Sequence, residues 1–395
     1  MTPTRIVFPT MALRFEISQA IQPDRLGAMW RDLEARADRP FFLSWDWIGC
    51  WMAETAIPPT VLIGRNDQQV VLLGILVPGR RRIAWPIAIS GVHLHATGDL
   101  RKDVITIEYN GFLVDRRCGD TAQDEAIAFL FGRRRAEEPR FDELHLYNIL
   151  HTHEAVARSN GLGHAVLITR GSYRVDLGKL RETGHGYLDS LSSNTRQQIR
   201  RSVRLYEKRG RVEARRAEGV AESLQFLDGL KVLHQRYWVG KGQPGAFSYP
   251  FFERFQHRLI EACAPKGALE LVRVTCGGDP IGYLYNLVDR GHVYAYQSGF
   301  LFDADPKLKP GLVSHTLCIE MHQREGAAIY DFMAGEARYK ASLGERGPDM
   351  YYVLLQQPVL SARLEGALHD LKARLVAMGQ RRSAGTAATE PGAAG

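Results

Sequence analysis

Residues 269–298 carry the pattern that most restricts the fold. Three runs rich in Val, Leu, Ile and Tyr follow one another with only short turn signals between them, namely Gly277-Gly278 and Asp289-Arg290-Gly291. Connections this short join antiparallel neighbours, so the runs predict a meander of three strands. The predicted strands are Leu269 to Thr275, Ile281 to Val288 and Val293 to Ser298.

A helix is expected directly after the meander, from Gly311 to Arg324, and a strand from Ala328 to Phe332 follows it. This order predicts a strand, a crossover helix and a parallel strand. Pro310 suits the first helical turn and Gly311 allows close approach of a ligand. The free amides of this turn, together with Lys307 and Lys309, predict a site for a pyrophosphate; the amides belong to Leu312, Val313 and Ser314. An ordinary capped surface helix is the alternative.

The whole chain has 395 residues, which exceeds the size at which one core keeps growing. We expect two α/β domains with mixed sheets, residues 1–175 and 176–380, and a disordered tail over 381–395. Helices and strands alternate in both. Other expected elements include strands over 60–64, 70–77, 82–89, 104–114, 143–149 and 351–356, and helices over 24–37, 121–135, 186–209, 221–237, 250–264 and 359–378.

The composition narrows the class of protein. There are 51 Lys and Arg residues against 44 Asp and Glu, a net charge of +7, which favours anionic partners. No apolar run is long enough for a membrane helix, and the N-terminus lacks the pattern of a signal peptide, so a cytoplasmic location is expected. The five cysteines lack CxxC spacing, which argues against a disulfide framework or a zinc site.

Several sequence blocks resemble the CelD-like branch of the GNAT acyltransferase superfamily, which is distantly similar to the Fem-type aminoacyltransferases with two GNAT-like halves. The blocks are FFLSWDW, IEYNGFL, LSSNTRQQIRRSVRLYEKRG, LHQRYWVGKGQPGAF, YQSGF, KPGLVSH and YDFMAGEARYK. The resemblance covers roughly residues 10–360. The usual glycine-rich signature of GNAT proteins is absent, and Lys309-Pro310-Gly311 stands in its place.

The resemblance implies that acyl-CoA is the cosubstrate and that no permanent cofactor or metal is needed. CoA would lie between the strand ending at Ser298 and the parallel strand 329–332, with its pyrophosphate at Gly311. Gln297 and Ser298 would face it, unless they only cap the meander. Tyr339, after the last core strand, matches the acid that protonates the departing thiolate, although a packing role is equally open.

Three residues are candidates for the base that takes the proton of an amine. His234 lies in a predicted helix, where a structural hydrogen bond is the alternative. Glu108 lies in an apolar run, where a carboxylate needs a partner or a function. Asp331 ends a predicted strand beside the expected crevice, a common position for ligand contacts. We favour His234 slightly.

A stripe of arginines follows the predicted helix over 186–209. Arg196, Arg200 and Arg204 are spaced by four and share one face. They either bind the 3′-phosphate of CoA or an anionic acceptor, or are simply solvated.

The expected function is acyl transfer from a CoA thioester to a primary amine, on an amino sugar of a polysaccharide precursor or on a long-chain amino lipid. Aminoacyl transfer from aminoacyl-tRNA, as in the Fem type, is the first alternative. A basic nucleic-acid-binding module is a weak second one, because no nucleic-acid-binding motif is present. Peripheral contact with an anionic membrane is compatible with the charge.

Overall fold

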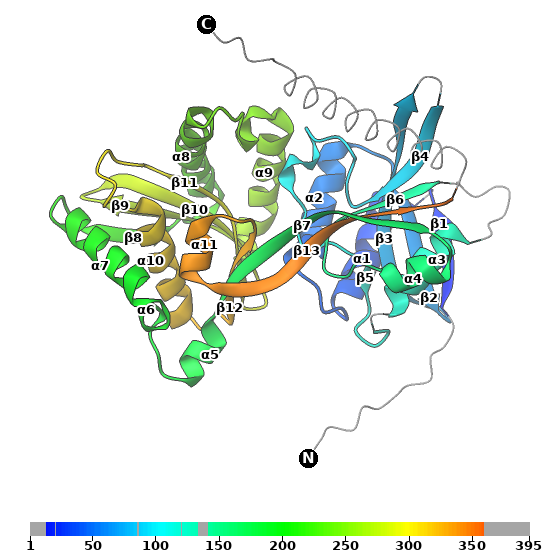
Figure 1. Cartoon of the computed structure of the whole chain (residues 1–395), viewed down its shortest axis with the longest axis horizontal. Coiled ribbons are helices and arrows are strands. Elements are labelled where there is room, and N and C mark those ends of the chain that lie inside the picture. The colour runs from blue at the N-terminus through cyan, green and yellow to red at the C-terminus, as the bar shows by residue number, and fades with distance from the viewer. Residues whose placement is uncertain (1–12, 20, 85–86, 120, 133–140, 359–395) are drawn as a thin grey trace, which may run out of the picture.

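A computed structural model describes residues 13–19, 21–84, 87–119, 121–132 and 141–358. These residues form two lobes built on one 13-stranded mixed sheet (Figure 1). The strand order is β1-β2-β3-β4-β6-β13-β7-β12-β11-β10-β9-β8, with β5 paired to β3. The expected α/β class with mixed strand directions is confirmed by this sheet.

The first lobe contains a meander, a helix and a parallel strand. β2, β3 and β4 pair antiparallel, and β6 then lies parallel to β4. Its elements are β1 (Arg14–Ser18), α1 (Pro23–Glu34), η1 (Phe41–Leu43), α2 (Trp45–Thr55), β2 (Thr60–Asn66), β3 (Gln69–Ala84), β4 (Ile87–Leu94), η2 (Asp103–Ile105), β5 (Leu113–Val114), α3 (Thr121–Phe131), β6 (Glu143–Ile149) and α4 (Glu154–Ser159).

The second lobe repeats this order with β9, β10 and β11, then α10 and the parallel strand β12. The expected meander and crossover helix are therefore confirmed. Its elements are α5 (Leu177–Glu182), α6 (Tyr187–Ser190), α7 (Ser193–Glu207), β8 (Val212–Arg216), α8 (Gly219–Gly240), η3 (Ala246–Ser248), α9 (Pro250–Cys263), η4 (Ala264–Lys266), β9 (Leu269–Cys276), β10 (Asp279–Asp289), β11 (His292–Phe300), α10 (Pro310–Arg324), β12 (Ile329–Ala334) and α11 (Arg338–Leu343).

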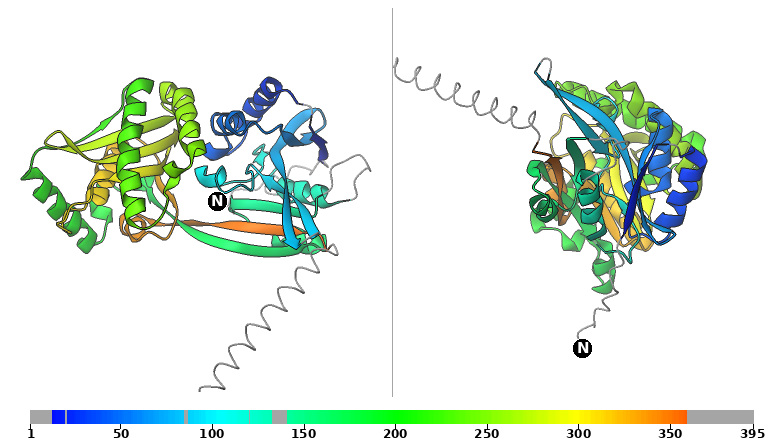
Figure 2. Two further views of the ribbon diagram at one scale, coloured as in Figure 1. Left: turned by 90° about the horizontal axis from the view of Figure 1, so that it is seen from above. Right: turned by 90° about the vertical axis from the view of Figure 1, so that its right-hand side faces the viewer.

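Two long strands join the lobes. β7 (Gly163–Asp176) and β13 (Glu345–Gln356) pair antiparallel and run side by side from one lobe into the other (Figures 1 and 2). β13 also pairs with β6 in the first lobe, whereas β7 pairs with β12 in the second. The backbone hydrogen bonds of one sheet thus hold both lobes together.

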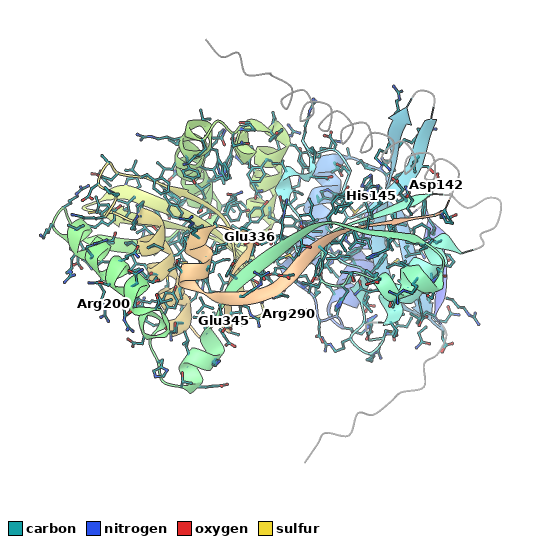
Figure 3. All side chains as sticks on the ribbon, viewed as in Figure 1. Asp142, His145, Arg200, Arg290, Glu336 and Glu345 are labelled. Atoms are coloured by element: carbon teal, nitrogen blue, oxygen red, sulfur yellow. The ribbon has the colours of Figure 1, made fainter. Side chains whose placement is uncertain are left out.

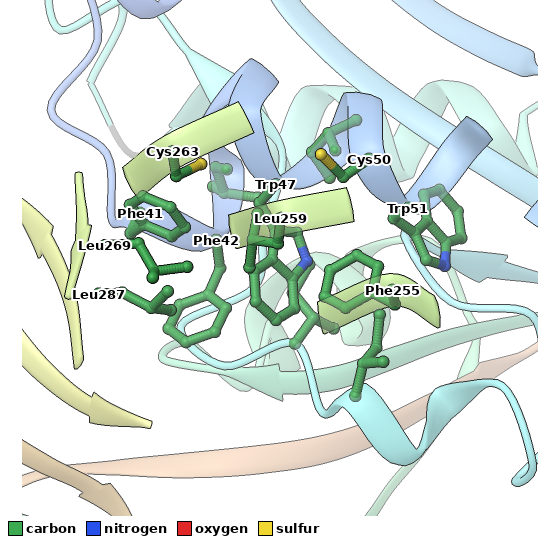
Figure 4. Close-up of a cluster of buried hydrophobic side chains, with 14 of the residues drawn as sticks. Phe41, Phe42, Trp47, Cys50, Trp51, Phe255, Leu259, Cys263, Leu269 and Leu287 are labelled. Atoms are coloured by element: carbon green, nitrogen blue, oxygen red, sulfur yellow. The ribbon is translucent and has the colours of Figure 1, made fainter. Parts of the chain in front are cut away.

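The lobes also share a hydrophobic core between α2 and α9 (Figure 4). The Trp47 ring lies 4.7 Å from Phe42 and 4.9 Å from Phe255, measured between ring centroids, and all three side chains are buried. Ion pairs surround this core: Arg39 with Asp289, Glu54 with Arg254, and Asp46 with Lys266. A core built from both lobes favours their folding as one unit.

The structure corrects several sequence expectations. Residues 104–114 were expected as one strand, but only Leu113–Val114 pair as a strand. The segment before them contains the η2 turn and leaves the sheet. The helix expected over 186–209 is divided into α6 and α7, and Ser192 caps α7 by accepting the Thr195 amide. β3 continues through the turn expected at Pro78-Gly79. The expected helix 359–378 and the tail lie outside the described residues.

None of the described helices has the length and apolar character needed to cross a bilayer. All five cysteines are free thiols, and four of them are buried.

Candidate functional site

The candidate site begins where β11 and β12 separate. Their parallel pairing covers only His292 to Tyr294 on β11 and Ile329 to Asp331 on β12. Beyond Tyr294, β11 continues to Phe300 without β12 beside it. The separation leaves an unpaired strand edge at the carboxyl end of β12, in the middle of the sheet.

Local irregularities in both strands produce this separation. In β12, the register with β7 shifts between Asp331 and Met333, and Met333 has a φ of 62°. The Asp331 carboxylate stabilises this conformation by accepting the Met333 amide at 2.7 Å. In β11, the register with β10 skips Tyr296. Bulges of this kind increase strand twist and redirect side chains.

A cavity of about 870 Å³ occupies the gap. Its walls come from both lobes: Val104, Thr106 and Glu108 belong to the first, and α8, β11, α10, β12 and α11 belong to the second. The sequence-predicted residues that line it are Glu108, His234, Gln297, Ser298, Lys309, Gly311, Leu312 and Tyr339.

The start of α10 faces this cavity through Lys309, Gly311 and Leu312. Lys309 is the N-cap residue and no side chain caps the helix, so the first-turn amides are open to a ligand. An added Cβ at Gly311 would meet the Phe300 ring at 3.3 Å, which explains a small residue there. Positive partial charge at a helix start and a lysine nearby suit an anionic group.

The Glu108 side chain reaches the cavity from the first lobe and is 6% exposed. Its Oε2 accepts a hydrogen bond from the Ala334 amide at 2.8 Å. Burial raises the pKa of Glu108 to about 7, although the Ala334 amide and the nearby Lys340 lower it in part. A carboxylate that titrates near neutrality and faces a cavity is suited to proton transfer.

Two neighbours of Glu108 were not predicted from the sequence. Lys340 lines the cavity, and its Nζ donates to the Ala334 carbonyl at 2.5 Å. Burial lowers the pKa of Lys340, an effect that Glu108 and Asp331 partly offset. Tyr109 donates its hydroxyl to Asp331 at 2.7 Å, from the first lobe to the second. Lys340 lies in the same sequence block as Tyr339, but nothing in the sequence distinguishes it from the nearby Arg338.

Asp331 does not line the cavity, contrary to its expected position. It is 2% exposed and lies behind the wall, where its Oδ2 is bonded to the Tyr109 hydroxyl and lies 3.0 Å from His292 Nε2. Its other oxygen accepts the Met333 amide. With both oxygens engaged, Asp331 fixes the shape of the wall and cannot reach an amine in the cavity.

Tyr339 lines the cavity from α11. Its ring stacks on His315 at a centroid distance of 5.4 Å and an interplanar angle of 16°. Burial raises the pKa of Tyr339 to about 12, so the phenol stays protonated at neutral pH. The same burial lowers the pKa of His315 to about 3, which leaves a neutral ring beneath Tyr339.

His234 lines the cavity from α8 but is less suited to act as a base. Its Nδ1 lies 3.1 Å from Gln235 Oε1, and its ring contacts Trp238 and Phe247. Burial lowers the pKa of His234, with partial compensation from Gln235. The ring is neutral at pH 7 and is a weaker base than an exposed histidine.

Four other predicted residues lie outside the cavity wall. The Val313 amide bonds to the Lys309 carbonyl, and Ser314 lies on the buried face of α10. Arg196 bonds to the carbonyls of α6, and Arg200 is exposed on α7 at the far end of the second lobe (Figure 3). The open amides of the α10 start are therefore those of Gly311 and Leu312.

The corresponding gap in the first lobe is closed. The parallel pairing of β4 with β6 is as short as that of β11 with β12, because it covers only Gly91 to His93 of β4. Beyond it, Asn110 forms an isolated parallel bridge with Ile149 at the end of β6. The Oδ1 atom of Asn110 also accepts a 2.9 Å hydrogen bond from Nδ1 of the buried His95. The segment that closes this gap is the one that carries Glu108 and Tyr109 toward the second lobe. The first lobe thus supplies side chains to the open site.

A separate buried cluster has ligand atoms of Glu270, Cys318 and His322 within 4.8 Å of one another. The Glu270 carboxylate is already bonded to His322, Asn286 and Arg216. The guanidinium of Arg216 opposes a cation there, so the cluster is a hydrogen-bonded structural network.

Comparison with known proteins agrees with this geometry. The model of the acetyltransferase (GNAT) domain family matches residues 193–341. FemX has a similar fold, with a TM-score of 0.55 and 11% identity over 89% of this chain and 99% of that one. A conserved protein of unknown function from Bacteroides thetaiotaomicron has a TM-score of 0.50 and 10% identity, over 87% of this chain and 100% of that one. No curated protein sequence matches the chain.

The matched residues contain α7, the meander β9 to β11, the start of α10, the separated strand β12 and Tyr339. Most residues of the site lie within this range, and the exceptions come from the first lobe: Val104, Thr106, Glu108 and Tyr109. Residues 193–341 therefore match an acetyltransferase domain of the GNAT type, in agreement with the resemblance of the sequence blocks.

Proposed function

We propose that the protein transfers an acyl group from a CoA thioester to a primary amine, carried by an amino sugar precursor or by a long-chain amino lipid. One observation carries the proposal. The Glu108 carboxylate, with a pKa of about 7, shares a cavity with the open start of α10 and the Tyr339 phenol. A base, an anion site and an acid are the groups that this reaction needs.

The donor lies along the unpaired edge of β11 in this proposal. The pantetheine arm of CoA contains amides, which pair with backbone groups beyond Tyr294, where β12 no longer does so. The pyrophosphate binds the Gly311 and Leu312 amides and the Lys309 ammonium. Gln297 and Ser298 lie beside the arm on the same strand.

Proton transfer is divided between two side chains. The amine nitrogen attacks the thioester carbonyl, the C–N bond forms, and Glu108 takes the proton that the nitrogen loses. The C–S bond breaks, and the Tyr339 hydroxyl gives its proton to the thiolate. Tyr339 is then reprotonated and Glu108 deprotonated through solvent, so the products are an amide and free CoA. The positive charge of Lys340 stabilises the ionised form of Glu108. Asp331 fixes the conformation of Met333, next to the Ala334 amide that bonds to Glu108.

The test is the release of free thiol from acyl-CoA, followed with a thiol-reactive dye over a panel of amines. We expect amine-dependent release by the wild-type chain and release at least about 100-fold slower by Glu108→Gln at pH 7.5. Mass spectrometry of the product would identify the amide. Absence of release with every acyl chain and amine in the panel would contradict a CoA donor.

A Fem-like reaction with aminoacyl-tRNA is the second candidate, and the exposed arginines of α7 favour it. Arg200, Arg201 and Arg204 are all exposed and together form a cationic surface. If they bind tRNA, Arg200→Ala with Arg204→Ala would weaken tRNA binding and reduce its salt dependence. Normal tRNA binding by this double variant, or no binding by the wild type, would exclude the candidate.

A further inference from the structure

Five large apolar side chains are exposed on the C-terminal half of α8 and in the loop after β11, and three of them line the cavity. We call them the apolar rim: Val232, Tyr237, Trp238, Val239 and Phe302. Val239 is 63% exposed and Phe302 is 55% exposed. Burying such side chains stabilises a folded protein, so a group of them left in water at a functional cavity indicates an interaction surface.

The two segments that carry the rim are in contact. Tyr237 at the end of α8 and Phe302 after β11 are 5.2 Å apart between ring centroids. Tyr237, Trp238 and Phe302 also line the cavity. An apolar path therefore runs from the surface into the site that contains Glu108 and Tyr339.

Basic side chains border the rim. Arg236 and Lys241 flank Tyr237 to Val239 and are exposed, and Lys307 is exposed in the loop that carries Phe302. Among the described residues, none of these three cations is in an ion pair, whereas the nearby acid Asp303 is paired with Arg209. The Lys241 ammonium lies 6.0 Å from the Tyr237 ring centroid. The same loop also contains Asp305, which accepts the Lys307 amide. With Asp303 paired, the border of the rim still carries a net positive charge.

We propose that the apolar rim docks on an anionic lipid surface and that the amine acceptor enters the cavity from that surface. This rests on the proposed function and commits it to a long-chain amine, an amphiphile whose chain passes along the rim while its amino group reaches Glu108. Trp and Tyr rings prefer the interface between water and acyl chains. Lys and Arg next to them are attracted to anionic headgroups.

The chemistry of the rim selects a lipid surface over a protein partner. The aromatic and aliphatic side chains stand on a helix end and a loop tip, bordered by cations, which is the arrangement of an interfacial anchor. The alternative partner for this surface is an acidic soluble protein. If the rim binds such a protein and no lipid, the chain should not bind vesicles.

The test is sedimentation of the full chain with phosphatidylcholine vesicles that contain or lack phosphatidylglycerol. We expect binding to the anionic vesicles that weakens as salt is raised. Val239→Glu and Phe302→Glu should each bind about ten-fold more weakly, because each loses apolar contact and gains a repelled charge. Leu100→Glu is the matched control: it makes the same change in charge at a side chain 85% exposed on the first lobe, and it should bind as the wild type does.

Three results would overturn the proposal: no binding of the wild type to either vesicle, equal binding to neutral and anionic vesicles, or equal weakening by Leu100→Glu. Circular dichroism of each variant controls for folding. The binding measurement needs no acyl transfer. Vesicle binding without thiol release would therefore reject the proposed function alone, and thiol release without vesicle binding would reject the lipid surface alone.

Discussion

The Glu108 carboxylate of the first lobe accepts a hydrogen bond from the Ala334 amide of the second lobe, at 2.8 Å between residues 226 positions apart. This contact places an ionisable group from one lobe beside the separated strands of the other. Its burial raises the pKa of Glu108 to about 7. The proposed chemistry therefore depends on both lobes.

The first prediction concerns the pH dependence of acyl transfer. A base must be deprotonated to act, so the wild-type rate should rise with pH through about 7 and then level off. Glu108→Gln should lower the rate about 100-fold or more at saturating substrates and remove this rise. Turnover measured from pH 5.5 to 9, with CoA affinity from calorimetry as the control, tests it. A variant that keeps the wild-type rate and profile would remove Glu108 from the mechanism.

His234→Ala provides the comparison, because His234 lines the same cavity. Its ring is neutral at neutral pH, since burial lowers the pKa of His234. We expect the variant to retain the rise in rate through pH 7 and to change the acceptor KM more than kcat. If the rise disappears in His234→Ala and persists in Glu108→Gln, the histidine is the base, as the sequence slightly favoured.

The ionised form of Glu108 should lower the free energy of unfolding at high pH. The folded state raises the pKa of Glu108 above its unfolded value, so it binds the proton more tightly than the unfolded chain, and stability declines as pH rises from about 4.5 to 7. Glu108→Gln removes this ionisation. At pH 8 the variant should be more stable by roughly 1 to 3 kcal/mol, and at pH 4.5 the difference should largely vanish. Urea unfolding at both pH values measures it, and an equal difference at both would contradict it.

Tyr339→Phe should lower kcat more than it raises the acyl-CoA KM. The phenyl ring keeps the stack on His315, whereas the proton for the thiolate is lost. We expect a larger effect with a poor thiolate leaving group than with an activated, acidic thiol, since an acidic thiol needs no proton. Wild-type turnover at saturating substrates would assign Tyr339 to packing.

Much of the second lobe could be predicted because its signals are local. The meander from Leu269 to Ser298 is set by apolar runs and two-residue to three-residue turns, and α10 by Pro310-Gly311. β7 was not predicted. Three consecutive apolar side chains in its middle, Val166 to Ile168, are exposed, so buried and exposed positions do not alternate there. Its pairing with β12 and β13 also depends on residues far along the chain.

The site could be predicted only in part, for a related reason. The sequence marks Glu108 as a candidate because a carboxylate is costly in an apolar run. The same sequence predicts a strand over residues 104–114, which is wrong for Glu108. Its position depends on Asn110, which closes the gap of the first lobe. Lys340 gives no such signal, because its burial arises from the packing of α11 against the wall of the cavity. Long-range packing decided what the local pattern left open.

The last prediction tests the donor site at Gly311 with two matched substitutions. Gly311→Ala and Gly311→Asp both add a Cβ that meets the Phe300 ring at 3.3 Å, a contact that a small shift of the ring relieves. Only Asp adds a negative charge at the helix start, where it would occupy the open amides and repel a pyrophosphate. We therefore expect Gly311→Ala to weaken CoA binding modestly and Gly311→Asp to abolish it, while both melt as cooperatively as the wild type. Calorimetry with CoA and with dephospho-CoA, which keeps the pyrophosphate but lacks the 3′-phosphate, separates this site from the arginines of α7. Unchanged affinity in a folded Gly311→Asp variant would mean that the pyrophosphate binds elsewhere.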